Sequence, residues 1–498
     1  MRAAMSRADA FPHLRQDFAA SLVVFLVALP LCVGVAVASG VPAELGLITG
    51  IVGGLVTGSM RGSSLQVSGP AAGLTVLVFE AVQTFGLPAL GVIVLASGLL
   101  QLAMGALRLG RWFRAISVSV VEGMLAGIGL VLIAGQLYTA AGAEAPASGT
   151  EKMTGIPGLL ADALSSPEAL ASLAVAVSTV VLVVTWGRMP KRVRAVPGAL
   201  AAVALATLVT LAFDLPVGTV QVQGLLDAVQ IPPLSEFGGL ATLSLLGTVA
   251  AFTLIASAES LFSAAAVDRL HDGPRTRYDK ELMAQGAGNT VCGILGALPM
   301  TAVIVRSSAN VRAGARTRAS RVLHGVWLLL FAALFPSALA LIPLPALAGI
   351  LIHAGWKLIP LRSLVALWRE HRGEALILVV TAVAIVTVNM FEGVLTGLAL
   401  SVAKAAWDAS HIRLEVVETR DDLVRARLSG NATFLRLPKI LDSLEALPKD
   451  RPVALDLSGL HHLDHACRTA LENWAERHSA SGTEPVRLTR EDVVTASP

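Results

Sequence analysis

The chain has 498 residues, of which 54% are hydrophobic and 15% are charged, with a mean hydropathy of +0.71 and a formal net charge of +3. So few charges cannot cover the surface of a soluble domain of this length, which excludes a soluble globular protein. The charges are also segregated, because residues 17–107 hold few of them and residues 411–492 hold many. This composition predicts a membrane domain over 1–410 and a small soluble domain over 411–498.

The apolar segments predict an α-helical polytopic membrane protein. A helix needs about 20 apolar residues to cross the hydrocarbon of a bilayer. We predict fourteen spans, two of them unusually short, over residues 18–38, 44–60, 70–84, 88–107, 116–138, 169–186, 197–213, 243–267, 281–298, 301–314, 320–337, 342–358, 374–390 and 392–409.

The loop charges orient these spans. If the N-terminus lies inside and the spans alternate, the outside loops hold a single basic residue, Lys152, and the inside loops hold the rest. This bias orients membrane proteins. It predicts a multi-pass protein of the cell inner membrane, with the N-terminus and the soluble domain in the cytoplasm.

The two short spans have matching interruptions. The third span begins at Pro70, within "QVSGPAAG", and the tenth begins near Thr301, within "GALPMTAVIV". They lie seven spans apart and so face opposite ways, which indicates an inverted repeat with a site between the breaks. Non-helical backbone at membrane depth is tolerated where protein or a water-filled cavity satisfies it.

A helix that starts in mid-membrane directs its free N–H groups and the positive end of its dipole at the bilayer centre. Two such ends facing each other would form an anion site. Ser68 and Gly69 would lie near the first helix start, and Pro70 suits a first helical turn. The alternative, with equal weight on this stretch alone, is an ordinary loop at 66–70 before a re-entrant packing segment.

Two charged residues within the predicted spans bear on function. Arg306 is the one basic residue of the first thirteen spans that is not at a span end, because Arg312, Arg321 and Lys357 lie within two residues of an end and are counted with the inside loops. We expect Arg306 to raise the positive potential at the anion site. It could instead extend to the cytoplasmic side or pair with a carboxylate. Glu259 lies near the middle of the eighth span, where it would bind a coupling proton or sodium ion, or else serve as a structural partner. Gln285 and Asn289 are predicted to hydrogen-bond across the bundle.

The soluble tail alternates in polarity and predicts a small α/β domain. "IRLEVVET" and "LVRARLSG" indicate a hairpin, and "PVALDLSG" a buried strand. "ATFLRLPKILDSLEAL" and "CRTALENWAERH" indicate helices. "LHHLDH" is predicted to be a hydrophilic loop rather than a metal site. The three cysteines are far apart and predict neither a disulfide nor a metal site.

Two long stretches resemble the sulfate permease (SulP) family of anion transporters. They are "GLITGIVGGLVTGSMRGSSLQVSGPAAGLTVLV" and "ELMAQGAGNTVCGILGALPMTAVIVRSSANVRAGARTRAS", with an Arg-Ser step before the half-helix. The tail resembles the family's STAS domain at "ALDLSGLHHLDH". The resemblance implies a seven-plus-seven inverted repeat with core and gate domains, a homodimer and an elevator movement of core against gate.

By position, the resemblance also implies the site. The substrate would be held between the N-termini of the third and tenth spans, and the coupling ion would bind at Glu259 and Thr301. Leu31 stands where many relatives carry a polar residue, so no polar contact is expected from the first span. The substrate-binding positions are Leu31, Val35, Ser68, Gly69, Ala71, Ala72, Thr301, Ala302, Arg306 and Ser307.

The sequence thus predicts a secondary active transporter of small inorganic anions, bicarbonate or sulfate, which is coupled to protons or sodium or works by exchange. The alternatives are a dicarboxylate (fumarate-like) symporter, a nucleobase carrier of the same fold and a membrane-anchored scaffold. No enzyme is predicted, because no nucleophile constellation or phosphate-binding loop is present. The predicted partners are the anion, membrane lipid and a second copy of the chain. We expect no nucleic acid, and no cofactor beyond Na⁺ or H⁺.

Overall fold

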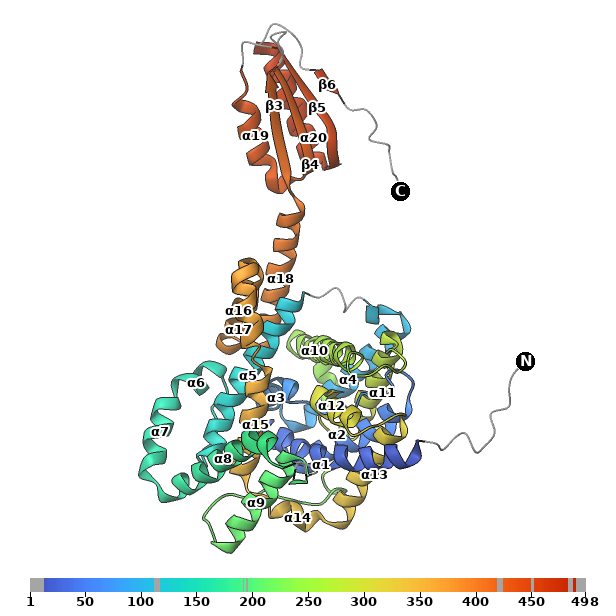
Figure 1. The fold of residues 1–498 in the computed structure, drawn as a ribbon, viewed down its shortest axis with the longest axis vertical. Helices are drawn as coiled ribbons and strands as arrows, with labels where there is room; N and C mark the ends of the chain where they lie inside the picture. Colours follow the sequence, from blue (N-terminus) through green and yellow to red (C-terminus); the bar gives the residue numbers. More distant parts are fainter. Residues whose placement is uncertain are drawn as a thin grey trace, which may run out of the picture. The chain divides into compact units, whose positions relative to one another are not determined.

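The computed structural model describes residues 13–111, 117–190, 192–193, 196–418, 424–448, 452–481 and 487–489 (Figure 1). The chain divides into two compact units, Met1–Leu398 and Ala399–Pro498. This division falls inside one helix, α18 (Met390–Ala409), which ends beside the predicted boundary at 410. The two units are described separately.

The first unit is helical. Besides α18, its helices are α1 (Leu14–Ala38), α2 (Ala43–Val52) with the π-helix η2 (Gly53–Thr57), α3 (Thr75–Phe85), α4 (Leu87–Ala106), α5 (Val118–Ala140), α6 (Gly149–Thr154), α7 (Ile156–Ser165), α8 (Pro167–Thr185), α9 (Gly198–Ala212), α10 (Leu243–Val267), α11 (Tyr278–Ile294), α12 (Ile304–Arg312), α13 (Ala319–Leu334), α14 (Pro336–Ala340), α15 (Leu344–Leu358), α16 (Leu361–Glu370) and α17 (Arg372–Thr387). Each predicted span overlaps one of these helices.

Length and composition alone allow six helical segments in the described residues to cross a membrane. They are Leu14–Ala38, Leu87–Ala106, Val118–Ala140, Pro167–Arg188, Leu243–Val267 and Leu344–Glu370. Several other apolar helices are shorter, because breaks and turns interrupt them. The count of fourteen spans therefore stays a prediction.

The helices pack as two groups, which we name the core group (α1–α4 and α10–α13) and the gate group (α5, α8, α9, α15 and α17). Figure 1 shows α5 to α9 gathered on one side of this unit and α10 to α13 on the other. Glycines allow the close approaches between helices. A Cβ on Gly46 of α2 would collide with the Cys32 carbonyl of α1, and one on Gly293 of α11 with the Leu95 backbone of α4.

The two predicted breaks meet in the middle of the core group. Residues Ser68–Pro70 form β1 and residues Met300–Ala302 form β2, and the two strands pair antiparallel with Gly69 opposite Thr301. The backbone N–H of Val303 also donates to the carbonyl of Val67 at 2.9 Å. Each broken segment thus satisfies its backbone hydrogen bonds with the other.

This pairing corrects two predicted helix starts. Pro70 is not in a first helical turn, because it is the last residue of β1, and the 3₁₀-helix η3 (Ala72–Leu74) begins only after the extended residue Ala71. The tenth span does not start at Thr301, which lies in β2. It starts at Ile304, so the Arg306–Ser307 step lies inside α12 rather than before it. The pairing of β1 with β2 moves both helix starts to later residues, and this pairing cannot be predicted from the local sequence.

The second unit contains the predicted α/β domain. Strands β3 (Ile412–Glu418), β4 (Val424–Ala432), β5 (Val453–Leu463) and β6 (Arg487–Thr489) form one sheet in that order. The pair β3–β4 is antiparallel and the other two pairs are parallel. Helices α19 (Leu437–Glu445) and α20 (His465–Ser481) share an apolar core with the sheet.

The prediction of a loop for "LHHLDH" is wrong. Residues 460–463 continue β5, and Asp464 begins α20 as its cap, because Asp464 Oδ1 accepts the backbone N–H of Cys467 at 2.7 Å. Polar residues at the end of a strand and at a helix cap resemble a loop in composition, which explains the error. Within the described residues no group of three His, Cys, Asp or Glu side chains is placed to hold a metal.

Candidate functional site

Side chains from neighbouring helices hold the two strands in place. Asn289 of α11 binds both backbone groups of Met300: its Oδ1 accepts from the N–H at 2.7 Å and its Nδ2 donates to the carbonyl at 3.1 Å. Gln285, one turn earlier, donates to Ser68 Oγ at 2.7 Å. The predicted role of Asn289 and Gln285, hydrogen bonding across the bundle, is confirmed.

Two further serines hold the strands β1 and β2, and we name these two strands with the helix starts that follow them the frame. The hydroxyl of Ser307, on α12, accepts the backbone N–H of Val67 at 2.9 Å. The hydroxyl of Ser260, on α10, accepts the N–H of Ala302 at 3.2 Å. The strands are therefore fixed from α10, α11 and α12 together. The Ser68 and Ser307 hydroxyls, both predicted to contact substrate, already have protein partners.

The helices that follow the two strands both start without a side-chain cap. Ala71 precedes η3 and Val303 precedes α12, and neither supplies a capping oxygen. The first turn of a helix leaves N–H groups without an intrahelical partner. Since β1 and β2 run antiparallel, the two helix starts lie at opposite ends of a small sheet and carry the positive ends of their dipoles towards it. This juxtaposition was predicted from the two breaks.

Arg306 is fully buried, with 0% of its surface exposed. Its Nη2 donates to the carbonyl of Pro70 at 3.3 Å, whereas its Nε and Nη1 have no partner with hydrogen-bond geometry, and the Cys32 thiol lies beside the guanidinium. The burial excludes a side chain that extends to the cytoplasmic side. No carboxylate of the described residues lies within ion-pair distance of it either. A buried guanidinium with two unsatisfied donors is costly unless a ligand or water meets them.

Gly69 is the backbone position that makes room for this guanidinium. A Cβ at residue 69 would collide with Nη1 of Arg306. The first break therefore needs glycine for a close approach and not for an unusual backbone angle.

Glu259 lies beside the start of η3. A Cβ on Gly73 would lie 2.6 Å from Glu259 Oε1, so the carboxylate rests directly on this helix start. It also neighbours the side chain of Thr301 on β2. Glu259 Oε2 and Thr301 Oγ1 are both buried and lack a partner with hydrogen-bond geometry. Glu259 and Thr301, predicted to share a coupling ion, are thus brought together.

The remaining predicted positions lie on the same frame or on the helix beside it. Ala71, Ala72 and Ala302 belong to the two breaks themselves. Helix α1, which carries Leu31 and Val35, packs against β1 and α12. Val35 is buried, whereas Leu31 is half-buried against an apolar cluster that includes α15.

A second buried arginine escaped the sequence analysis. Arg321, on α13, is 2% exposed and donates to the carbonyls of Thr57, Gly58 and Ser63 at 2.7, 2.8 and 2.5 Å. It closes the C-terminal end of η2, where a cation complements the helix dipole. Arg306 is therefore not the only buried basic residue of the bundle. The sequence did contain a signal for Arg321: it lies at the start of an apolar helix, where the helix dipole disfavours a cation, so a structural partner could have been expected.

Replacing Gly69 by alanine should displace the Arg306 guanidinium and lower thermal stability. Overpacking of this kind costs about 1–3 kcal/mol, which should appear as a lower melting temperature of the purified protein in detergent. Gly158→Ala is the matched control, since a Cβ at Gly158 would meet nothing within 4 Å. Equal melting temperatures for the two variants would show that Arg306 does not occupy this position.

Comparison with known proteins places this geometry in context. The Sulfate permease family profile matches residues 14–381. The "Putative sulfate transporter YvdB" of Bacillus subtilis is 27% identical over 93% of this chain and 89% of its own length. The "Bicarbonate transporter BicA" of Picosynechococcus is 25% identical over 94% and 87%. The inward-facing structure of the murine anion transporter Slc26a9 shares the fold, with a TM-score of 0.78 and 15% identity over 98% of this chain and 90% of that one.

Proposed function

The chain belongs to the sulfate permease family and is a multi-pass membrane protein, and from this premise we propose that it is a secondary transporter of small inorganic anions. The observation that carries the proposal is Arg306, whose two unsatisfied donors are buried next to two uncapped helix starts. Positive charge and free N–H groups are what an anion requires in a dry site. A neutral nucleobase can accept hydrogen bonds from the guanidinium, but it would leave the buried positive charge uncompensated.

Bicarbonate and sulfate are the proposed substrates. Of the two curated relatives, one is named for sulfate and the other for bicarbonate. Both anions present several oxygens, which can accept from the two helix starts and from Arg306 together. We place the anion between the N-termini of η3 and α12.

Glu259 and Thr301 are the proposed coupling site. Their unpartnered oxygens, Oε2 and Oγ1, can hold a proton or ligate a sodium ion beside the anion. A cation here would offset the negative charge that the carboxylate otherwise adds next to the substrate. Because the anion and the proton or sodium ion would bind side by side on the core group, they would cross the membrane together.

An elevator movement of the core group against the gate group would carry this site across the membrane. Strands β1 and β2 pack against α1, α2, α10 and α11, and α12 itself belongs to the core group, so these elements can move as one body. We propose that the chain works as a homodimer in the cell inner membrane, with both termini in the cytoplasm, in agreement with the loop charges.

Uptake into liposomes tests the function. Purified protein is reconstituted, and labelled bicarbonate, sulfate and fumarate are offered with an imposed proton or sodium gradient. We expect gradient-dependent uptake of bicarbonate or sulfate. Uptake of fumarate alone would favour the dicarboxylate symporter, and no uptake of any anion under any gradient would contradict the proposal.

Lys152 provides a test of the elevator movement. It lies on α6, is 5% exposed, and holds its Nζ 4.5 Å from the ring centroid of Phe79 on α3. Burial lowers the pKa of Lys152, and the nearby Glu80 carboxylate raises it. Helix α6 packs against α5 and α17 of the gate group, so this cation–π contact links the two groups and must break if they slide. Such contacts contribute about 0.5–2 kcal/mol.

We therefore expect Lys152→Met to shift the conformational equilibrium by roughly 3- to 30-fold. The measurement is maleimide labelling of Ser244→Cys, which lines a hollow between α3, α10 and α18, against a background of three buried native cysteines. Lys152→Arg keeps the contact and serves as the control. If Ser244→Cys is labelled at the same rate with Lys152→Met as with the native Lys152, the interface between α6 and α3 does not move.

A further inference from the structure

Very short connections join helix α16 to the membrane helices on either side. Only Ile359 and Pro360 separate it from α15, and only His371 separates it from α17. The turns are hydrogen-bonded: the N–H of Leu361 donates to the Ile359 carbonyl at 3.0 Å, and that of His371 to Leu367 at 2.7 Å. Since α15 and α17 belong to the gate group, α16 must lie at the level of the bilayer where they end.

One face of α16 is apolar and uncovered within the described residues. Leu361, Val365 and Trp368 are 47%, 55% and 53% exposed, and no residue of the helix is buried. These positions follow the i, i+4, i+7 spacing and so form one stripe. A tryptophan in such a stripe is typical of the boundary between headgroups and acyl chains. Trp356, at the end of α15, is also exposed, at 58%.

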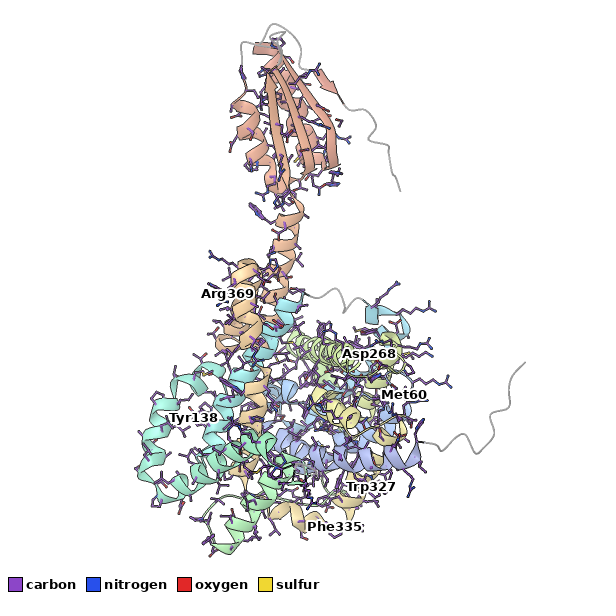
Figure 2. All side chains as sticks on the ribbon, viewed as in Figure 1. Met60, Tyr138, Asp268, Trp327, Phe335 and Arg369 are labelled. Carbon is purple, nitrogen blue, oxygen red and sulfur yellow. The ribbon has the colours of Figure 1, made fainter. Side chains whose placement is uncertain are left out.

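Positive charge flanks this stripe. Arg362 and Arg369 are seven residues apart, on one side of the stripe, and Figure 2 labels Arg369 on α16. Neither arginine has an ion-pair partner among the residues that the structure describes. From residue 357 to residue 372 the chain carries Lys357, Arg362, Arg369 and Arg372 against a single acidic residue, Glu370. A protein partner would need carboxylates to match these arginines, whereas an anionic bilayer supplies the negative charge through its phosphate groups.

We propose that α16 lies in the interface of one leaflet, the cytoplasmic one in the predicted orientation, and binds anionic phospholipid. Leu361, Val365 and Trp368 insert among the acyl chains, and Arg362 and Arg369 contact the phosphate groups. Clusters of basic residues beside membrane helices attract anionic lipids in this way. The contact fixes the gate group to the bilayer surface on this side.

The test measures where α16 lies and does not use transport, so its outcome is independent of the proposed substrate. The full chain carries a fluorophore on Val365→Cys, within the stripe, or on Glu370→Cys, on the opposite face. Both are reconstituted in phosphatidylcholine vesicles containing about a third phosphatidylglycerol. Iodide in solution and nitroxide-labelled lipid quench the fluorophore from the two sides.

We expect lipid nitroxide to quench the dye at residue 365 and iodide to quench the dye at residue 370. With the nitroxide on phosphatidylglycerol instead of phosphatidylcholine, quenching at residue 365 should rise about two- to fivefold. Arg362→Gln with Arg369→Gln should abolish that rise, whereas Arg188→Gln with Arg192→Gln, at another exposed basic segment, should not.

Iodide quenching at residue 365 as strong as at residue 370 would overturn the proposal, because the stripe would then face water. Protection of residue 365 from both quenchers would also overturn it, since the stripe would then be covered by a second copy or by the C-terminal unit. Equal quenching of the dye at residue 365 by the two labelled lipids, with Arg362 and Arg369 both present, would refute the preference for anionic lipid.

Discussion

Replacing Arg306 by alanine is expected to weaken anion binding by roughly 10- to 100-fold, since a hydrogen bond to a charged partner contributes about 1.5–3 kcal/mol. The guanidinium is buried, and two of its donors are unmatched, so an anion placed there would meet an undiminished positive charge. The loss should appear as a higher anion concentration for half-maximal uptake, and as a higher Kd when binding is measured in detergent.

Arg312→Ala is the matched control for this variant. Arg312 ends the same helix, is exposed, and carries the same charge, so its loss tests whether the effect is due to net charge alone. Arg306→Lys separates charge from geometry, because a lysine keeps the charge but cannot donate in the fixed fork of a guanidinium. If Arg306→Ala is folded and binds the anion with the affinity of the unmodified chain, Arg306 is not part of the binding site.

Replacing Glu259 by glutamine should abolish coupling while anion exchange continues. Glutamine keeps the size and the contact with Gly73, but it can neither take up a proton nor supply a negative charge to sodium. Accumulation of anion against its gradient should therefore fall to the level seen without an imposed cation gradient. The two gradients are applied one at a time, so that the experiment also names the coupling ion.

The control for Glu259→Gln is Glu168→Gln, an exposed carboxylate in the first turn of α8, which should leave uptake unchanged. Both variants should elute at the same size as the unmodified chain, because Glu259 contacts η3 and β2 and not a surface. Full gradient-driven accumulation in Glu259→Gln would assign coupling to another group.

The sequence predicted the helices because length and hydrophobicity are local properties. It also predicted that the two broken segments meet, since equivalent interruptions in the two halves of a transporter mark a shared site. How the two segments pair does not depend on local sequence. The ladder between 68–70 and 300–302 links residues far apart in the chain, so Pro70 could be taken for a helix start when it is the end of a strand.

Burial and partners were likewise decided in three dimensions. By sequence, Arg306 lies within a span and Arg321 at the edge of one, yet both are buried. The carbonyls of Thr57, Gly58 and Ser63 accept from Nη1 and Nη2 of Arg321 and leave only its Nε without a partner, whereas Arg306 keeps Nε and Nη1 without one. Composition and periodicity determined by themselves that this chain is a helical membrane protein with a soluble tail. Only the tertiary structure decided which buried guanidinium finds several backbone partners and which keeps two donors unpartnered, because hydrogen-bond partners come from distant segments.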